Sequence, residues 1–287
     1  VEQFMYRFDE HAFGLTRSRK ANGQGKDEYE LQTDDYPARR TTGRPWPLPS
    51  PSKCYGFPDE ASTYYQNTGF LPDFVRAFED ALDRIAYLGP LREYPRRTYV
   101  WAGERPVDVG QKGEQAIPAL LAARAENLKS GRGVGRRRRY KPIEQRIAEW
   151  LKTMGLVDSF TLQPLAANRK EYEIRVKRSP SSAEVALTDV GFGVSQVLPV
   201  LVLCYFVPEH STLLLEQPEI HLHPSVQADL ADVFIDVVTN RNVQIVLESH
   251  SEHLLRRLQR RVAEERMDAD QTALYFCTMF EGTSRLH

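Results

Sequence analysis

The chain has 287 residues, of which 41% are hydrophobic and 27% are charged, and its formal net charge at pH 7 is −1. This length provides for one large domain or two small ones with an ample core. Such a small charge gives no global indication of a nucleic-acid or membrane surface, and no apolar run is long enough to span a membrane. The first residues carry no secretory signal, and three scattered cysteines (Cys54, Cys204 and Cys277) favour reduced thiols in a cytoplasmic protein over a disulfide or metal–cysteine framework.

The N-terminal part of the chain alternates between patterned and irregular stretches. Residues 1–15 show enough apolar alternation for a strand, whereas residues 16–58 are polar and rich in proline, glycine and charge. That composition is typical of a long irregular insertion. Apolar residues at helical spacing predict a helix over 70–85, and residues 85–92 read as a short strand broken by a Gly-Pro pair.

The middle of the chain, residues 114–180, is expected to form an inserted subdomain of helices and strands. A helix is predicted over 115–128, and an amphipathic helix begins at Pro142. Alternating apolar residues predict a strand over 172–176, with a partner strand near 185–187.

A basic linker over 131–140 lies within this subdomain. It contains three glycines and four consecutive arginines, Arg136, Arg137, Arg138 and Arg139. Glycine makes such a tract flexible, and the arginines keep it in water. Two interpretations stay open: an exposed connector, or a contact that supplies phosphate affinity for DNA without reading its sequence.

The C-terminal lobe, residues 185–287, has a different pattern, in which apolar strands alternate with helices of ordinary length. That order predicts a mainly parallel sheet with right-handed crossovers. Helices are expected over 194–206, 225–238 and 251–265, and strands over 212–216, 243–247 and 272–280.

One polar cluster, residues 189–196, is expected in a loop of this lobe just before a helix. Gly191 and Gly193 let the backbone approach a ligand closely, and the free N–H groups of the helix N-terminus suit a phosphate. Ser195 adds a hydroxyl group to the same cluster.

Two more polar clusters follow the predicted strands 212–216 and 243–247. In open α/β sheets, ligands bind beyond the carboxyl ends of the strands. Glu216 ends a buried strand and Glu219 comes close behind it, which is how a nucleoside triphosphatase holds Mg²⁺ and positions water. His250 follows the next strand and can donate a hydrogen bond to a terminal phosphate or to the attacking water.

In chain order, these motifs are the glycine-rich signature 189–196, the stretch Glu-Gln-Pro-Glu-Ile-His-Leu-His-Pro at 216–224, and Ser249-His250. Together they resemble the C-terminal half of an ABC-type ATPase head of the RecF, SMC and overcoming-lysogenization-defect (OLD) group. Within that group the sequence is most similar to bacterial AAA-family ATPases with the same Walker B stretch, and residues 87–92 and 109–114 also resemble that subfamily. The resemblance implies an α/β fold: a three-layer head, incomplete over 1–287, with a mainly parallel C-terminal sheet and the inserted subdomain.

The resemblance also implies roles for individual residues. Glu216 takes the Mg²⁺ position of the Walker B strand, Gln217 stands where the catalytic glutamate is usual, and His250 matches the switch histidine that senses the γ-phosphate of ATP. The signature loop, which contacts the nucleotide of the opposite subunit, is matched by Gly191, Gly193, Ser195 and Gln196.

The active unit implied by the resemblance is a head-to-tail homodimer with two Mg²⁺–ATP complexes at its interface. ATPases of this group act in DNA repair or phage defence, often beside a nuclease or toxin effector protein. No nuclease motif occurs in this sequence, so an effector would be a separate partner. DNA could be bound by the basic linker and by Arg92, Arg96 and Arg97.

Two features depart from the family pattern. The Walker A loop is missing, because Gly23-Gln24-Gly25-Lys26 lacks the first glycine of the motif, the preceding apolar strand and the following helix. We therefore expect this loop to lie outside the chain and ATP hydrolysis to depend on it. The amide of Gln217 can orient water but cannot accept its proton. Slow hydrolysis as a subfamily trait is favoured, while a transfer of the role to Glu219 and an introduced substitution stay open.

Two other functions are weighed against the ATPase. His221 and His223 are two apart on a segment read as extended, and with Glu219 or His250 they make a loose Zn²⁺ or Mn²⁺ pattern, that of a metallohydrolase. The non-enzymatic alternative is a dimerisation switch that binds ATP but barely hydrolyses it, which Gln217 favours.

Overall fold

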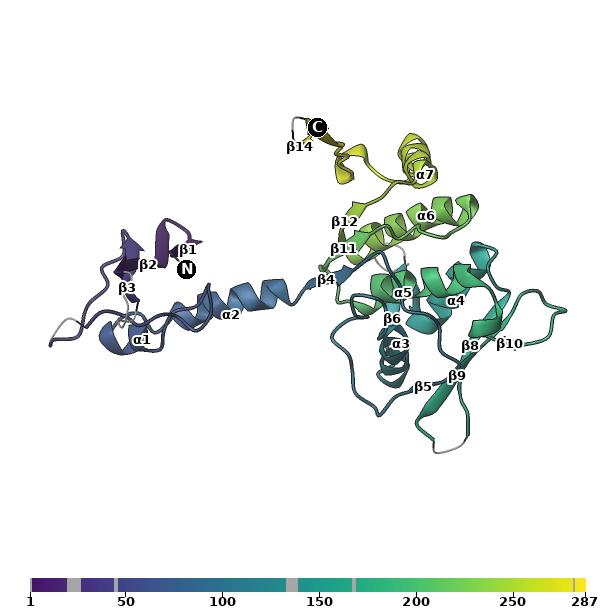
Figure 1. Cartoon of the computed structure of the whole chain (residues 1–287), viewed down its shortest axis with the longest axis horizontal. Helices are drawn as coiled ribbons and strands as arrows, with labels where there is room; N and C mark the ends of the chain where they lie inside the picture. Colours follow the sequence, from purple (N-terminus) through teal and green to yellow (C-terminus); the bar gives the residue numbers. More distant parts are fainter. Residues whose placement is uncertain (1, 20–26, 44–45, 133–138, 167–168, 281) are drawn as a thin grey trace. The chain divides into compact units, whose positions relative to one another are not determined.

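The computed structural model describes residues 2–19, 27–43, 46–132, 139–166, 169–280 and 282–287. The chain divides into two compact units, residues 1–83 and residues 84–287 (Figure 1). The sequence predicted one incomplete head over 1–287 and did not predict this division.

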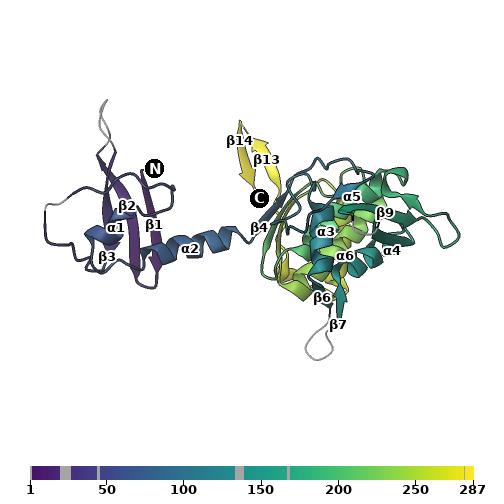
Figure 2. The same ribbon diagram turned by 90° about the horizontal axis from the view of Figure 1, so that it is seen from below.

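The first unit contains an antiparallel sheet in the order β1-β2-β3, whose strands lie side by side in Figure 2. β3 lies inside the segment 16–58, so the prediction of an irregular insertion is wrong there. Tyr29 and Leu31 alternate with charged residues along β3 and pack into an aromatic core with Phe13. The bounds are β1 Gln3–Phe8, β2 His11–Arg19, β3 Glu28–Asp34, α1 Glu60–Tyr64 and α2 Leu71–Leu82.

The second unit is built around α5, which is apolar on all sides and buried from Val194 to Phe206. A helix of this kind needs neighbours all round, and α3, α4 and α6 pack against it. The predicted middle helices and strands are present. Strands β5, β8, β9 and β10 form a four-stranded sheet, and β6 and β7 form a hairpin. The bounds are β5 Tyr99–Val100, α3 Ala116–Ala125, β6 Lys129–Arg132, β7 Arg139–Pro142, α4 Ile143–Thr153, β8 Ser159–Pro164, β9 Glu171–Lys177, β10 Val185–Ala186, η2 Leu187–Asp189 and α5 Phe192–Phe206.

A parallel sheet in the order β12-β11-β4 confirms the predicted α/β fold. One face of this sheet carries buried side chains, such as those of Leu88 and Leu213. The opposite face carries Ile85 and Val246, which are exposed within the described part of the chain. The bounds are β4 Ile85–Leu88, β11 Thr212–Glu216, α6 Pro224–Arg241, β12 Gln244–Glu248 and α7 Glu252–Ala263.

The last predicted strand, 272–280, does not join the parallel sheet. A short 3₁₀ helix, η3 (Ala269–Gln271), precedes this segment. Within the segment, only β13 (Cys277–Phe280) is a strand, and it pairs antiparallel with β14 (Thr283–Leu286). Gly282 has a φ of +76°, and this left-handed conformation lets the chain turn back at once. Residues 277–280 therefore take their strand partner from the residues that follow them rather than from β12, a pairing that the apolar pattern of 272–280 does not specify. Cys277 is exposed in this hairpin.

No helix in the described ranges is both long enough and apolar enough to cross a membrane.

Candidate functional site

The carboxyl edge of the parallel sheet brings Glu216 and Glu248 into register. The last paired residues of β11 and β12 are these two glutamates, so their backbones lie side by side. Because side chains alternate along a strand, both lie on the open face, together with Val246 two residues earlier on β12. Tyr87 of β4 belongs to the same face, and burial together with a hydrogen bond to the Glu216 carboxylate raises its pKa.

The loop after β11 turns sharply at Gln217. Gln217 has a φ of +43° and its backbone N–H donates to the carbonyl oxygen of Glu248 at 2.9 Å. His221 also has a positive φ, +61°, so residues 217–223 are not extended and the two histidines are not presented in the way that the metallohydrolase prediction assumed. His223 instead caps α6, where its Nδ1 accepts the backbone N–H of Ser225 at 3.3 Å.

Glu219 lies inside this loop rather than at its surface. The residue is only 6% exposed, and its Oε1 accepts the backbone N–H of His250 at 2.8 Å. Its Oε2 is buried and has no hydrogen-bond partner among the described residues. The carboxylate therefore ties the loop after β11 to the loop after β12, a position that does not suit a base that must meet a water molecule.

Arg92, in the loop after β4, is a buried cation at the same edge. It is 9% exposed, and its Nε, Nη1 and Nη2 have no hydrogen-bond partner among the described residues. Burial lowers its pKa to about 10, and nearby Tyr87 and Glu219 oppose that shift. The guanidinium group is thus still charged at neutral pH and supplies the positive charge that Glu219 faces.

Glu248 is a site residue that the sequence did not single out. Its Oε1 lies 3.1 Å from Nε2 of His250 and accepts a hydrogen bond from the Gln217 amide at 3.4 Å. The side chains of His250 and Glu248 are 78% and 50% exposed, so both can reach a ligand. The available signal was that Glu248 ends its strand in the same way as Glu216, but only the register of β11 and β12 shows that the two meet.

The predicted signature loop is exposed only at its start. Gly191 has a φ of +59° and is the N-cap of α5, which leaves the first N–H groups of the helix uncovered. Ser195 and Gln196 are 6% and 5% exposed, and the Ser195 hydroxyl donates to the carbonyl oxygen of Phe192 at 2.8 Å. Within the described ranges no hydrogen bond or ion pair joins this loop to Glu216.

The oxygen donors at the sheet edge fit Mg²⁺ better than a transition metal. Glu216 offers a carboxylate on the open face of the sheet, and Mg²⁺ is commonly held by one or two carboxylates plus substrate phosphates. Among the residues that the structure describes, no group of three or more His, Cys, Asp or Glu side chains could hold a metal ion. The geometry therefore gives the metallohydrolase interpretation no support.

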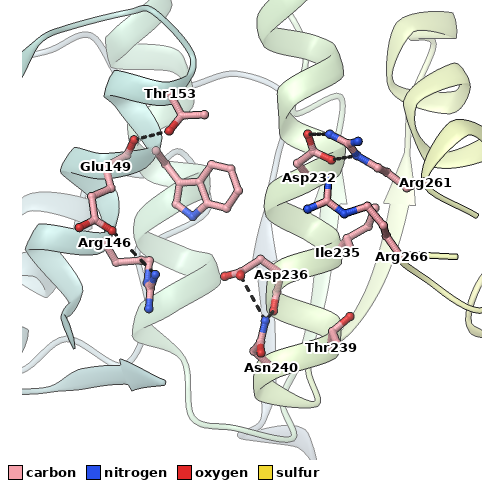
Figure 3. A pocket seen from close by; sticks show the side chains of 11 residues that line it. Arg146, Glu149, Thr153, Asp232, Ile235, Asp236, Thr239, Asn240, Arg261 and Arg266 are labelled. Carbon is pink, nitrogen blue, oxygen red and sulfur yellow. Dashed lines mark hydrogen bonds and ion pairs between the residues drawn. The ribbon is translucent and has the colours of Figure 1, made fainter. Parts of the chain in front are cut away.

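A cavity of about 360 Å³ lies between α4, α6, α7 and the segment that follows α7 (Figure 3). Several of its polar side chains contact one another: Arg261 donates to Asp232 at 2.8 Å, and the Asn240 amide donates to Asp236 at 3.2 Å. No predicted site residue lines this cavity. The predicted basic tract cannot be placed, because residues 136–138 and the side chain of Arg139 lie outside what the structure describes.

Part of the chain that includes two strands of this edge is similar to a known protein family. The matching family is the AAA ATPase domain, over residues 123–255. That range includes β11 and β12 and therefore Glu216, Gln217, Glu248 and His250. The resemblance to an ATPase head is confirmed over this segment.

No curated protein matches the chain. Solved structures with some similarity include the SMC head domain from Thermotoga maritima, which is 11% identical with a TM-score of 0.39 over 99% of this chain and 72% of that chain. An Smc head bound to the C-winged helix domain of ScpA is 11% identical with a TM-score of 0.42 over 96% of this chain and 67% of that one. The Smc head domain with an extended coiled coil from Pyrococcus furiosus is 13% identical with a TM-score of 0.37, over 50% of this chain and 34% of that chain.

Proposed function

We propose that this chain belongs to an ATPase head that binds ATP with Mg²⁺ at the carboxyl edge of β4, β11 and β12 and hydrolyses it. The observation that carries the proposal is the convergence of Glu216, Gln217, Glu248 and His250 at one sheet edge, inside the range that matches an AAA ATPase domain. Ligands of open α/β sheets bind at such an edge. The activity also requires a Walker A loop, which residues 1–287 do not contain.

Each residue at the edge has a distinct part in the proposed reaction. Glu216 holds Mg²⁺, which when bound neutralises charge on the β- and γ-phosphate oxygens. Gln217 orients the attacking water through its amide, and exposed His250 donates a hydrogen bond to the γ-phosphate. Glu219 is buried, and its carboxylate holds the loop that carries His250 through the backbone N–H of that residue.

The proposed active unit is a head-to-tail dimer in which the start of α5 faces the nucleotide of the other subunit. Two exposed aromatic rings support an interface there: Tyr94 and Phe192 are 72% and 53% exposed, and their ring centroids lie 5.5 Å apart. Aromatic side chains are enriched in the cores of interfaces. ATP should therefore convert the full-length protein from monomer to dimer in light scattering, and Phe192→Ser should weaken that conversion. A monomer at saturating ATP would rule out the dimer.

Phosphate release by the full-length protein with ATP and Mg²⁺ tests the ATPase proposal. Glu216→Gln should abolish Mg²⁺-dependent hydrolysis, whereas Glu104→Gln, the same change at an exposed position of the same unit, should leave it unchanged. Hydrolysis that survives Glu216→Gln at the parental rate would remove Glu216 from the site. The absence of ATP binding in the parent protein would reject the function itself.

A dimerisation switch that binds ATP and hydrolyses it slowly is the second candidate, and Gln217 is the residue that favours it. The amide cannot accept a proton, and its Nε2 is held 3.4 Å from Glu248. Ordinary ATPase turnover in the parent protein would refute a pure switch. A large gain in turnover for Gln217→Glu would support it.

The biological setting proposed from the family resemblance is DNA repair or antiviral defence, together with an effector protein. Binding of DNA through Arg136, Arg137, Arg138 and Arg139 would depend steeply on salt, because it would rest on phosphate contacts. Replacing the four arginines with serine should then weaken DNA binding and reduce its salt dependence. Unchanged binding would identify the tract as a connector.

A further inference from the structure

The proposed reaction needs an acceptor for the proton of the attacking water, and neither residue expected from the sequence supplies one. Gln217 has an amide, which cannot act as a base. Glu219 is 6% exposed and its Oε1 already accepts the backbone N–H of His250. Its Oε2 is buried as well, so a water molecule cannot reach either oxygen without a rearrangement of the loop.

Glu248 is the carboxylate that remains at this edge and is open to solvent. Its backbone pairs with Glu216 at the last position of the β11–β12 register, which puts its side chain on the open face of the sheet. Half of the Glu248 side chain is exposed. A base needs both properties, because it must lie beside the bound phosphates and still receive water.

The contacts of Glu248 bring its carboxylate beside the Gln217 side chain. Its Oε1 accepts from Nε2 of the Gln217 amide at 3.4 Å, and the two backbones are joined by a 2.9 Å hydrogen bond from Gln217 N–H to the Glu248 carbonyl. Nε2 of His250 lies 3.1 Å from the same Oε1. Both side-chain contacts use Oε1, and within the described ranges neither uses Oε2.

We propose that Glu248 is the general base of the ATPase reaction and takes over from β12 the task that a glutamate at position 217 would perform from β11. This inference rests on the proposed function. The water oxygen attacks the γ-phosphorus, and the bond from that phosphorus to the oxygen bridging to the β-phosphate breaks. ADP leaves with the electron pair of that bond. The proton of the water passes to the Glu248 carboxylate, which later releases it to solvent, and the products are ADP and inorganic phosphate.

The neighbours of Glu248 act as positioning residues in this scheme. The Gln217 amide holds Oε1 and can orient the water with its own carbonyl oxygen. His250 contacts the same oxygen through its Nε2 and is exposed enough to reach the γ-phosphate. A water held between these groups would be oriented by residues of both β11 and β12, so in this scheme turnover does not need a carboxylate at position 217.

The test compares four full-length proteins: the parent, Glu248→Gln, Gln217→Glu with Glu248→Gln, and Glu252→Gln as a control at a nearby exposed carboxylate. Loss of a general base lowers kcat by about 10²–10⁴-fold. Glu248→Gln should show that loss with little change in the Kd for ATP, and the purified dimer should retain ATP rather than ADP. The double variant should regain most of the turnover, because the carboxylate returns to the same place from the neighbouring strand.

The outcomes separate this inference from the proposed function. If the parent does not bind ATP, the proposed function fails and the inference fails with it. If the parent binds ATP and hydrolyses it, but Glu248→Gln retains the parental kcat, only the base assignment is overturned. The assignment is also overturned if Glu248→Gln loses turnover and Gln217→Glu does not restore it, since that result indicates a structural role.

Discussion

The carboxylate of Glu219 and the backbone N–H of His250 are joined by a 2.8 Å hydrogen bond. This bond links the loop after β11 to the loop after β12, two segments that the sequence separates by a whole helix. Arg92, in the loop after β4, is a buried cation whose charge interacts favourably with Glu219. The hydrogen bond thus joins the ends of β11 and β12, and the charge of Arg92 acts on the same carboxylate.

Removing the charge of Glu219 should destabilise this network. Glu219→Gln keeps the size of the side chain but weakens the bond to His250 and leaves Arg92 as an uncompensated buried cation, so we expect a loss of about 1–3 kcal/mol. Urea unfolding measures that loss. Arg92→Met alone should also destabilise, by leaving Glu219 charged and buried. The double variant should lose less than the two single variants together, since neither charge then remains, and strict additivity would contradict the coupling.

The sequence predicted the local parts of the fold well and the long-range pairings poorly. The helices and the strands β11 and β12 follow from apolar spacing, which is a local property. The antiparallel pairing of β13 with β14, the strand β3 and the division at residue 83 depend on contacts between segments that the pattern does not specify.

The same reason limits the prediction of the candidate site. Glu216 and His250 were found because they end predicted strands. Glu219 is buried in a loop that begins with a positive φ at Gln217, and neither feature can be predicted from the residue types. Glu248 enters the site only through the register of β11 with β12. Side-chain direction and strand register, rather than residue identity, are what the structure adds.

The loop 109–114 should be sensitive to any side chain at Gly113. This residue has a φ of +75°, and a Cβ there would lie 2.5 Å from Cβ of Pro199 in α5. Gly155 is a matched control, because its φ is +67° but a Cβ would meet nothing within 4 Å. Gly155→Ala should lose about 1–2 kcal/mol from the left-handed backbone alone. Gly113→Ala should lose about 1–3 kcal/mol more from overpacking, as measured by urea unfolding. If both variants lost the same free energy of unfolding, the loop 109–114 would be shown to accommodate the added methyl group without strain.

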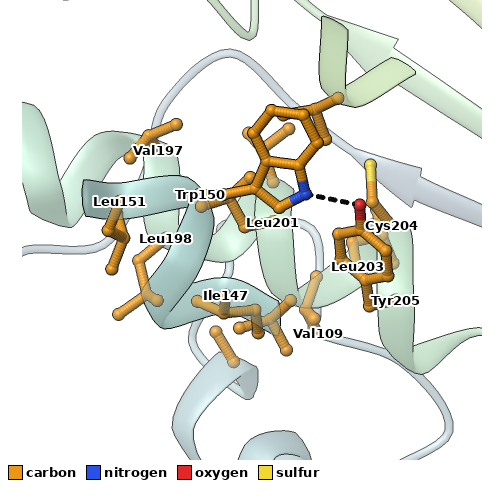
Figure 4. Close-up of a cluster of buried hydrophobic side chains, with 14 of the residues drawn as sticks. Val109, Ile147, Trp150, Leu151, Val197, Leu198, Leu201, Leu203, Cys204 and Tyr205 are labelled. Atoms are coloured by element: carbon orange, nitrogen blue, oxygen red, sulfur yellow. Dashed lines mark hydrogen bonds between the residues drawn. The ribbon is translucent and has the colours of Figure 1, made fainter. Parts of the chain in front are cut away.

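A buried hydrogen-bond chain connects α4, α5 and α6, and Figure 4 shows its first bond, from Trp150 to Tyr205. Nε1–H of Trp150 donates to the Tyr205 hydroxyl at 2.6 Å, and that hydroxyl donates to Oδ2 of Asp236 at 2.7 Å. Burial and the Asp236 carboxylate raise the pKa of Tyr205, so it remains a donor at neutral pH. Tyr205→Phe removes a partner from both neighbours, and we expect it to lower the free energy of unfolding by about 1–3 kcal/mol. Tyr275→Phe, at a 70% exposed position, should have no measurable effect in the same assay.

The contact between α6 and α7 should give the stability of the second unit a dependence on pH. Asp232 of α6 accepts hydrogen bonds from Arg257 and Arg261 of α7, at 2.7 Å from Arg257 Nη1 and 2.8 Å from Arg261 Nη2. Burial by itself raises the pKa of Asp232. The hydrogen bonds and positive charges of the two arginines lower it by more than burial raises it, so the net shift is downward. A carboxylate with a depressed pKa stabilises the fold above its unfolded pKa of about 3.9, and that contribution disappears as the pH falls through the folded pKa.

Asp232→Asn should therefore lower the free energy of unfolding by about 1–3 kcal/mol at pH 7, where the hydrogen bonds from Arg257 and Arg261 to a charged acceptor are present in the parent. The difference between parent and variant should shrink once the pH falls below about 4, because the parent carboxylate then gains a proton too. Urea unfolding at a series of pH values from 7 downward measures this difference in the free energy of unfolding. Asp270→Asn is the control at an exposed position. A difference that is the same at every pH would mean that Asp232 contributes through packing rather than through its charge.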